Sequence, residues 1–91
     1  MAKEALSEAF AVLLRKRRTE QGLSQVRLAE KARIHYSHVS LIERAERNPS
    51  LDVSQALAKA LGLKLSDLIR EAEEAQQISG SKQIAKSKTA L

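Results

Sequence analysis

The chain has no cysteine and no tryptophan, and its 91 residues include a single proline and three glycines. Without cysteine it can form neither a disulfide nor a thiolate metal site, and it has no thiol nucleophile. The glycines Gly22, Gly62 and Gly80 stand alone, so no glycine-rich loop is present to cradle a phosphate. A G-x-S-x-G nucleophile motif is absent too. These absences exclude the common enzyme classes, and we expect a protein that is not an enzyme and needs no cofactor.

Aromatic and β-branched side chains are also scarce. Phe10 and Tyr36 are the only aromatic residues, and valine and isoleucine together number nine, whereas alanine and leucine number 27. Strands favour β-branched and aromatic residues, whereas helices favour alanine and leucine. The composition therefore predicts an all-α fold with a compact core lined by leucine.

Membrane and export signals are missing from the sequence. No apolar run approaches the roughly 18 residues that a membrane span needs. The first residues, 1–4, lead straight into a charged amphipathic pattern rather than into a basic and then apolar leader. We therefore expect a cytoplasmic protein.

Two histidines and two neighbouring acids are the remaining candidates for a chemical site. His35 and His38 are spaced i, i+3, which could bring two imidazoles near one metal ion, but a third ligand is missing nearby. Glu73 and Glu74 are adjacent, and adjacent residues do not face each other on a helix. We expect no metal site and no catalytic residue.

The net charge of +5 is unevenly distributed. Residues 15–50 hold nine Lys and Arg against four Glu, a net charge of +5, whereas residues 51–78 hold three Lys and Arg against five acids, a net charge of −2. The last thirteen residues add three lysines. A basic first half suggests a face that binds a polyanion, and an ordinary solvated surface explains the same counts equally well.

Apolar spacing predicts five short amphipathic helices. Gly22 is placed to end the first, and Ser24, Ser50 and Ser66 are placed to cap the second, fourth and fifth. The predicted helices cover about 7–21, 24–32, 36–44, 51–61 and 66–78. We therefore expect an N-terminal lead over 1–6, one domain over 7–78, and a flexible basic tail over 79–91.

The second and third predicted helices have the features of a helix-turn-helix. The connection between them is tight, and Ala29 and Ala32 are small enough to let a neighbouring helix pack closely. The third helix has a mostly polar outward face. Two short helices of this kind are typical of a DNA-binding helix-turn-helix, whose second helix fits the major groove.

Several segments resemble the phage-repressor-like (Cro/Xre-type) helix-turn-helix family, in the family's order and at its spacing. They are Gln21–Ala32, Val39–Arg44, Arg47–Leu51, Leu57–Leu63 and Ser66–Leu68. The resemblance covers about residues 10–69. It implies a compact five-helix, lambda-repressor-like DNA-binding domain.

The resemblance also implies roles for individual residues. The positions that face base edges are occupied by Tyr36, Ser37, Ser40 and Leu41. The positions that contact phosphates are occupied by Gln25, Arg44, Arg47 and Asn48, and Gln25 also braces the start of the third helix. Arg18 and Glu43 match a pair that forms an internal salt bridge in similar proteins. Candidate dimer contacts, which simple core packing explains equally well, are Leu63, Leu65 and Ile69.

Four positions depart from the family's pattern. Arg33 and Ala45 stand where glycine is usual, and His35 stands where a Ser or Thr cap is usual. An L-residue in a left-handed turn costs about 1 kcal/mol unless the turn differs. Leu41 replaces a long polar residue, and a leucine can touch a thymine methyl but cannot form a hydrogen bond with a base.

The sequence thus predicts a sequence-specific, DNA-binding transcriptional regulator, a repressor or autoregulator that binds an inverted repeat of double-stranded DNA as a homodimer. One alternative is an antitoxin with the same domain, whose segment over 71–91 masks a toxin partner. Another is a protein-interaction module that has lost DNA binding and uses Tyr36 and Leu41 as an exposed pair.

Overall fold

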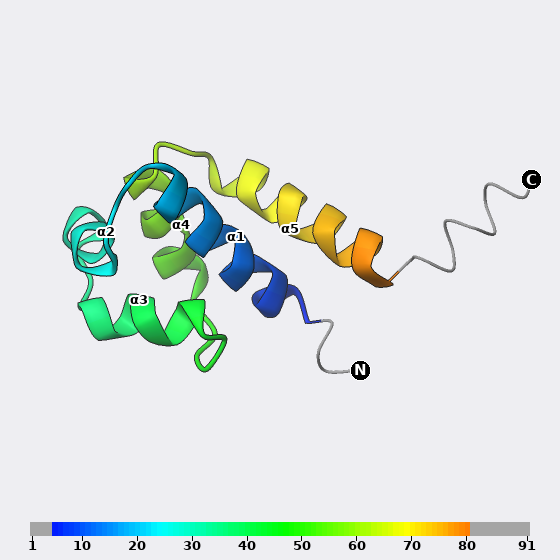
Figure 1. Cartoon of the computed structure of the whole chain (residues 1–91), viewed down its shortest axis with the longest axis horizontal. Coiled ribbons are helices and arrows are strands. Elements are labelled where there is room, and N and C mark those ends of the chain that lie inside the picture. Colours follow the sequence, from blue (N-terminus) through cyan, green and yellow to red (C-terminus); the bar gives the residue numbers. More distant parts are fainter. Residues whose placement is uncertain (1–4, 81–91) are drawn as a thin grey trace, which may run out of the picture.

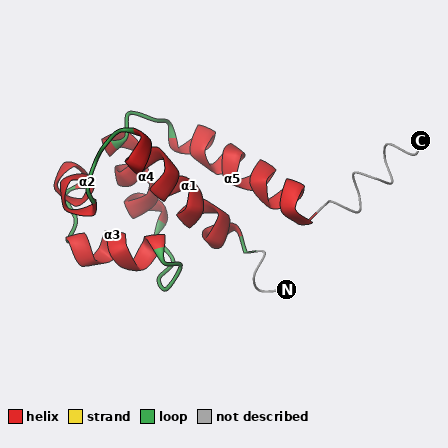
Figure 2. Cartoon of the chain, viewed as in Figure 1, coloured by secondary structure: helices red, strands yellow, loops and turns green. Residues whose placement is uncertain are grey.

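The structure is a computed structural model that describes residues 5–80. Within that range the chain forms five α-helices and no strand, and the predicted all-α fold is confirmed (Figure 2). The helices are α1 (Leu6–Glu20), α2 (Gln25–Ala32), α3 (Tyr36–Glu43), α4 (Leu51–Ala60) and α5 (Leu65–Gly80). The predicted lead and basic tail lie mostly outside the described residues, as do Lys82, Lys86 and Lys88. No helix within 5–80 is both long enough and apolar enough to cross a membrane.

The helices are arranged around α1, which packs against α3 and α5 (Figure 1). Helix α2 packs against α3 and α4, and α4 also contacts α5. Helix α5 runs alongside α1 and extends to the side of the molecule opposite α2 and α3. This arrangement leaves one side of α3 free of other helices.

One hydrophobic core joins all five helices. Each helix contributes at least one large side chain that is at most 1% exposed, and together these are Leu14, Leu28, Val39, Ile42, Leu57 and Leu68. Between α2 and α4 the buried residues include the small Ala29, Ala32 and Ala58, so the two helices approach closely. Full burial of one leucine or isoleucine stabilises the fold by about 1.5–3 kcal/mol, so this cluster positions α3 firmly.

Two of the three predicted serine caps are present. The Ser24 hydroxyl accepts a hydrogen bond from the Arg27 N–H at 3.0 Å, and the Ser50 hydroxyl accepts one from the Val53 N–H at 3.0 Å. The prediction for Ser66 is wrong, because α5 begins at Leu65 and Ser66 lies inside its first turn. The N–H groups of residues 67 and 68 already donate to the carbonyl of Lys64, so the helix starts before the serine.

Two residues that follow helices have a left-handed backbone conformation, which favours glycine. Arg33 follows α2 with φ +63° and ψ +42°, and Ala45 follows α3 with φ +59°. The turns therefore keep the backbone that glycine would adopt there, as Gly22 does after α1 with φ +71°. Each L-residue costs the fold about 1 kcal/mol in this conformation.

Replacing Ala45 by glycine is therefore expected to raise the free energy of unfolding by about 0.5–1 kcal/mol, because the relief of left-handed strain exceeds the entropy that glycine adds to the unfolded chain. Urea denaturation measures the change. The control is Ala75→Gly in the exposed middle of α5, which is expected to lower stability by about 1 kcal/mol. Equal destabilisation by both variants would contradict the strain at residue 45.

Candidate nucleic-acid interface

The C-terminal end of α3 is tied to α1 by a double hydrogen bond between charged groups. The Arg18 guanidinium donates from Nε to Glu43 Oε2 at 2.7 Å and from Nη2 to Oε1 at 2.9 Å. The Glu43 side chain is only 2% exposed and that of Arg18 11%. A third donor, Nη1 of Arg18, reaches the Leu23 carbonyl at 2.7 Å. Arg18 thus joins the end of α1, the loop after it and the end of α3.

Gln25, the first residue of α2, contacts the same carboxylate. Its Nε2 donates to Glu43 Oε1 at 3.0 Å, so one acid receives bonds from α1 and from α2. The expectation that Gln25 braces the start of α3 is wrong, because Glu43 is the last residue of that helix. The physical reason is that Glu43 is the buried acceptor within reach, whereas the start of α3 is satisfied locally.

The start of α3 is capped by a histidine. His35 Nδ1 accepts a hydrogen bond from the Ser37 N–H at 3.1 Å and lies 2.8 Å from the Ser37 hydroxyl oxygen. Its ring lies beside that of Tyr36, with 5.3 Å between the centroids. The departure from Ser or Thr at position 35 therefore leaves the helix with a side-chain cap.

The four residues expected to face base edges lie on one side of α3. Tyr36 is 52% exposed and Ser37 is exposed, whereas Ser40 and Leu41 are half-buried. The opposite side of the helix carries the buried core residues Val39 and Ile42. Because Leu41 is half-buried, the structure offers less support for an exposed Tyr36–Leu41 pair than the sequence suggested.

The segment after α3 carries the residues expected to contact phosphates. Arg44 is exposed, and its Nη2 lies 3.6 Å from Glu46 Oε1, a loose pair in which both side chains are more than half exposed. Arg47 and Asn48 are also exposed, and within residues 5–80 Arg47 has no ion-pair partner. The end of α3 thus presents two exposed guanidinium groups to the solvent.

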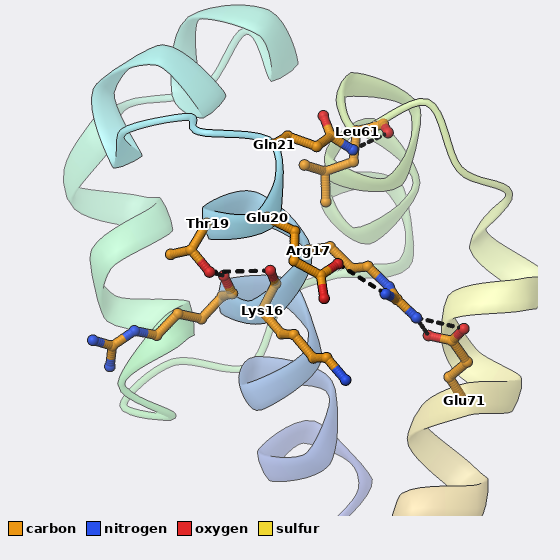
Figure 3. A network of polar contacts seen from close by, with 8 residues as sticks. Lys16, Arg17, Thr19, Glu20, Gln21, Leu61 and Glu71 are labelled. Atoms are coloured by element: carbon orange, nitrogen blue, oxygen red, sulfur yellow. Dashed lines mark hydrogen bonds and ion pairs between the residues drawn. The ribbon is translucent and has the colours of Figure 1, made fainter.

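A second ion-pair cluster joins α1 to α5, and the sequence did not reveal it (Figure 3). Arg17 Nη2 donates to both carboxylate oxygens of Glu71, at 2.6 and 2.7 Å, and Nη1 donates to Glu20 at 3.0 Å. The hydrogen bonds to Glu71 and then Glu20 raise the pKa of Arg17. Nearby, Gln21 Nε2 donates to the Leu61 carbonyl at 2.7 Å. Local sequence patterns could not identify for Arg17 a partner that lies 54 residues away.

A protein-family model described as helix-turn-helix matches residues 14–68, more than half of the chain. The immunity repressor protein of Bacillus phage phi105 is 46% identical over 54 residues, which are 59% of this chain and 38% of the repressor. The chain thus spans little more than a third of that relative.

Two solved structures have the same fold. The clp gene regulator ClgR from Corynebacterium glutamicum superposes with a TM-score of 0.80 and 25% identity, over 91% of this chain and 88% of that one. The restriction-modification controller protein C.AhdI from Aeromonas hydrophila has a TM-score of 0.66 and 39% identity, over 68% and 94% of the two chains.

Proposed function

Because the chain belongs to the Cro/Xre-type helix-turn-helix family and carries the DNA-binding domain of a transcriptional regulator, we propose that it is a cytoplasmic repressor or autoregulator that binds an inverted repeat as a homodimer. The family consists of transcriptional regulators rather than enzymes. The observation that carries the proposal is the way α3 is held, with a cap at its start and the Arg18–Glu43 pair at its end.

The free side of α3 is suited to reading bases. Tyr36, Ser37 and Ser40 offer hydroxyl groups that can donate to or accept from base edges in the major groove. Leu41 adds an apolar surface that fits the methyl group of thymine. We assign these four residues to base recognition, because none of them belongs to the buried side of α3 that Val39 and Ile42 form.

The residues that flank α3 are suited to contact the phosphates of the DNA backbone. Arg44, Arg47 and Asn48 follow its end, and Gln25 lies at the start of α2, next to the same carboxylate. One N–H of the Gln25 amide donates to Glu43, which holds the group in place and leaves its second N–H for a phosphate oxygen. Phosphate contacts of this kind fix the register of a helix in the groove without reading sequence.

Association of two chains is proposed through the start of α5 and the loop before it. Leu63, Leu65 and Ile69 are half-buried and pack against the edge of the core, so each keeps part of its apolar surface exposed. A single small module buries little DNA interface, and two modules related by a two-fold axis read two half-sites about one helical turn apart.

Selection of binding sites from random DNA with the purified protein tests the proposed function. We expect enrichment of an inverted repeat whose half-site centres are about 10 base pairs apart, bound by two chains. Enrichment of a single half-site would contradict the dimer. The absence of any enriched sequence at low salt would contradict sequence-specific DNA binding.

Substitution of Ile69 by lysine tests the dimer surface directly. A buried charge at a dimer contact is costly, so we expect Ile69→Lys to sediment as a monomer and to bind the full operator at least about tenfold more weakly. The matched control is Val12→Lys, at an apolar α1 side chain that is 67% exposed, and it should change neither property. Circular dichroism verifies that both variants fold. A folded Ile69→Lys variant that remains dimeric would contradict this surface.

The antitoxin alternative concerns residues 71–91. Residues 71–80 are the last ten residues of α5, where Ala72 is buried and Glu71 pairs with Arg17 on α1, and residues 81–91 lie outside the described part. Among residues 71–77, whose side chains the structure describes, no feature favours a toxin partner over this packing within the chain.

A further inference from the structure

A basic pocket lies between the C-terminal ends of α2 and α4, and none of its lining residues is assigned to base reading. It is an open depression of about 340 Å³, and its lining residues are Lys31, Ala32, Arg33, Ala56, Lys59 and Ala60. Three cationic side chains therefore surround three alanines, and no acidic residue lines the pocket. We refer to these six residues as the α2–α4 pocket.

The described part of the chain does not neutralise the cations of the α2–α4 pocket. Within residues 5–80, Lys31, Arg33 and Lys59 form no ion pair, and the side chains of all three are exposed. Five other arginines of the same range have acidic partners, namely Arg17, Arg18, Arg27, Arg44 and Arg70, whereas Arg15 and Arg47 form no ion pair there. Unpaired like charges around a concave surface create a positive potential that attracts anionic groups.

All three cations lie at the C-terminal ends of helices, and Arg33 is the residue directly after α2. Lys31 and Lys59 lie in the last turns of α2 and α4, where a cation is favourable beside free carbonyl groups. Arg33 holds a left-handed conformation that glycine would adopt without strain, and Lys31 already supplies a charge to that end of α2. Strain alone does not require a functional side chain, because Ala45 holds the same conformation with a methyl group. Its consequence at residue 33 is that the guanidinium group lines the pocket beside Lys31 and Lys59.

We propose that the α2–α4 pocket binds an acidic segment of a partner protein. Its carboxylates pair with Arg33, Lys31 and Lys59, and a small apolar side chain of the segment covers the alanines. A guanidinium fork matches a carboxylate in a two-point geometry, which gives Arg33 a mode of binding that the two lysines lack. A peptide can place an apolar side chain between two carboxylates and so cover the methyl groups of Ala32, Ala56 and Ala60, whereas the deoxyribose groups of a DNA backbone lie behind its phosphates.

An NMR titration of the labelled protein with a blocked peptide of alternating glutamate and alanine tests the proposal at low salt. We expect resonances of the α2–α4 pocket to shift, and a peptide of alternating glutamine and alanine to cause no such shift. Arg33→Gly should weaken binding of the acidic peptide by about fivefold, the usual effect of one exposed charge pair. The same variant should raise the unfolding midpoint, so that loss of binding cannot be attributed to loss of folded protein.

Ala45→Gly is the matched control, since it relieves the same type of strain without removing a charge. It should raise the unfolding midpoint and leave peptide affinity unchanged. Three results would overturn the proposal: no acidic-peptide shifts at the pocket, unchanged peptide affinity in Arg33→Gly, or a lower unfolding midpoint in that variant, which would make Arg33 a structural cap. Weaker binding of Arg33→Gly to random DNA, with peptide affinity intact, would also overturn it, because the pocket would then be a phosphate site.

Discussion

Replacing Glu43 by alanine is expected to lower the free energy of unfolding by about 3 kcal/mol, the cost of leaving one partner of a buried ion pair uncompensated. The Arg18 guanidinium would lose two of its three hydrogen bonds at a site where its side chain is only 11% exposed. Gln25 would lose the acceptor of its amide. Thermal unfolding followed by circular dichroism should show a midpoint roughly 10–20 °C lower.

The control for Glu43 is Glu30→Ala, which removes the acid of an exposed pair with Arg27 at 3.1 Å. Exposed pairs contribute little, so this variant should change stability by less than about 0.5 kcal/mol. A double variant, Arg18→Met with Glu43→Leu, removes both charges and should recover most of the lost stability. If Glu43→Ala melts like Glu30→Ala, the buried pair does not support the fold. Since Gln25 also loses the acceptor that orients its amide, the affinity of Glu43→Ala for DNA should fall somewhat further than the loss of folded protein alone explains.

The second large effect is expected at the groove-facing side of α3. Leu41→Ala should relax base preference at one pair of symmetric positions in the operator, most simply a thymine in each half-site, because its apolar contact is lost. Discrimination at a base pair is worth about 1–3 kcal/mol, and a homodimer counts it twice. The affinity of this variant for non-specific DNA should be unchanged. Since Leu41 is half-buried, the melting curve of the variant must be measured beside its binding.

Arg44→Ala should lower the affinity for DNA without changing the base preference. Its guanidinium is exposed at the end of α3 and held only by a loose pair with Glu46, so it is free to turn toward a phosphate. Its loss should weaken every site alike and reduce the slope of log affinity against log salt by about one per subunit. Arg70→Ala on α5, with the same change of charge and an acidic partner in Asp67, is the control and should leave affinity for DNA nearly unchanged.

Competition binding of these variants against a library of single-substitution operators, at several salt concentrations, separates the two roles. A preference profile that is unchanged in Leu41→Ala, or reshaped in Arg44→Ala, would show that the groove-facing side of α3 has been assigned wrongly.

The helices could be predicted from the sequence because their signals are local. Apolar periodicity and the caps Ser24 and Ser50 depend on residues within a few positions of each other. The same local reasoning failed at Ser66, because a serine can cap a helix but the preceding backbone had already begun one.

Contacts between residues far apart in the sequence were harder to predict. The pairing of Arg18 with Glu43 was expected only because similar proteins have such a pair. Nothing in the sequence connects Arg17 with Glu71, since both residue types are ordinary on helix surfaces. The α2–α4 pocket likewise required the packing of two helices whose spacing depends on small buried side chains.

The anchoring of α3 also bears on the thermodynamics of binding. An isolated helix of eight residues is barely populated in water, yet α3 is formed in the free protein through its buried side chains and the bonds to Glu43. The helix therefore reaches DNA already ordered, and association does not include the conformational entropy of folding it. For this chain, the rate of operator recognition should then follow electrostatic attraction and diffusion along DNA rather than a slow folding step.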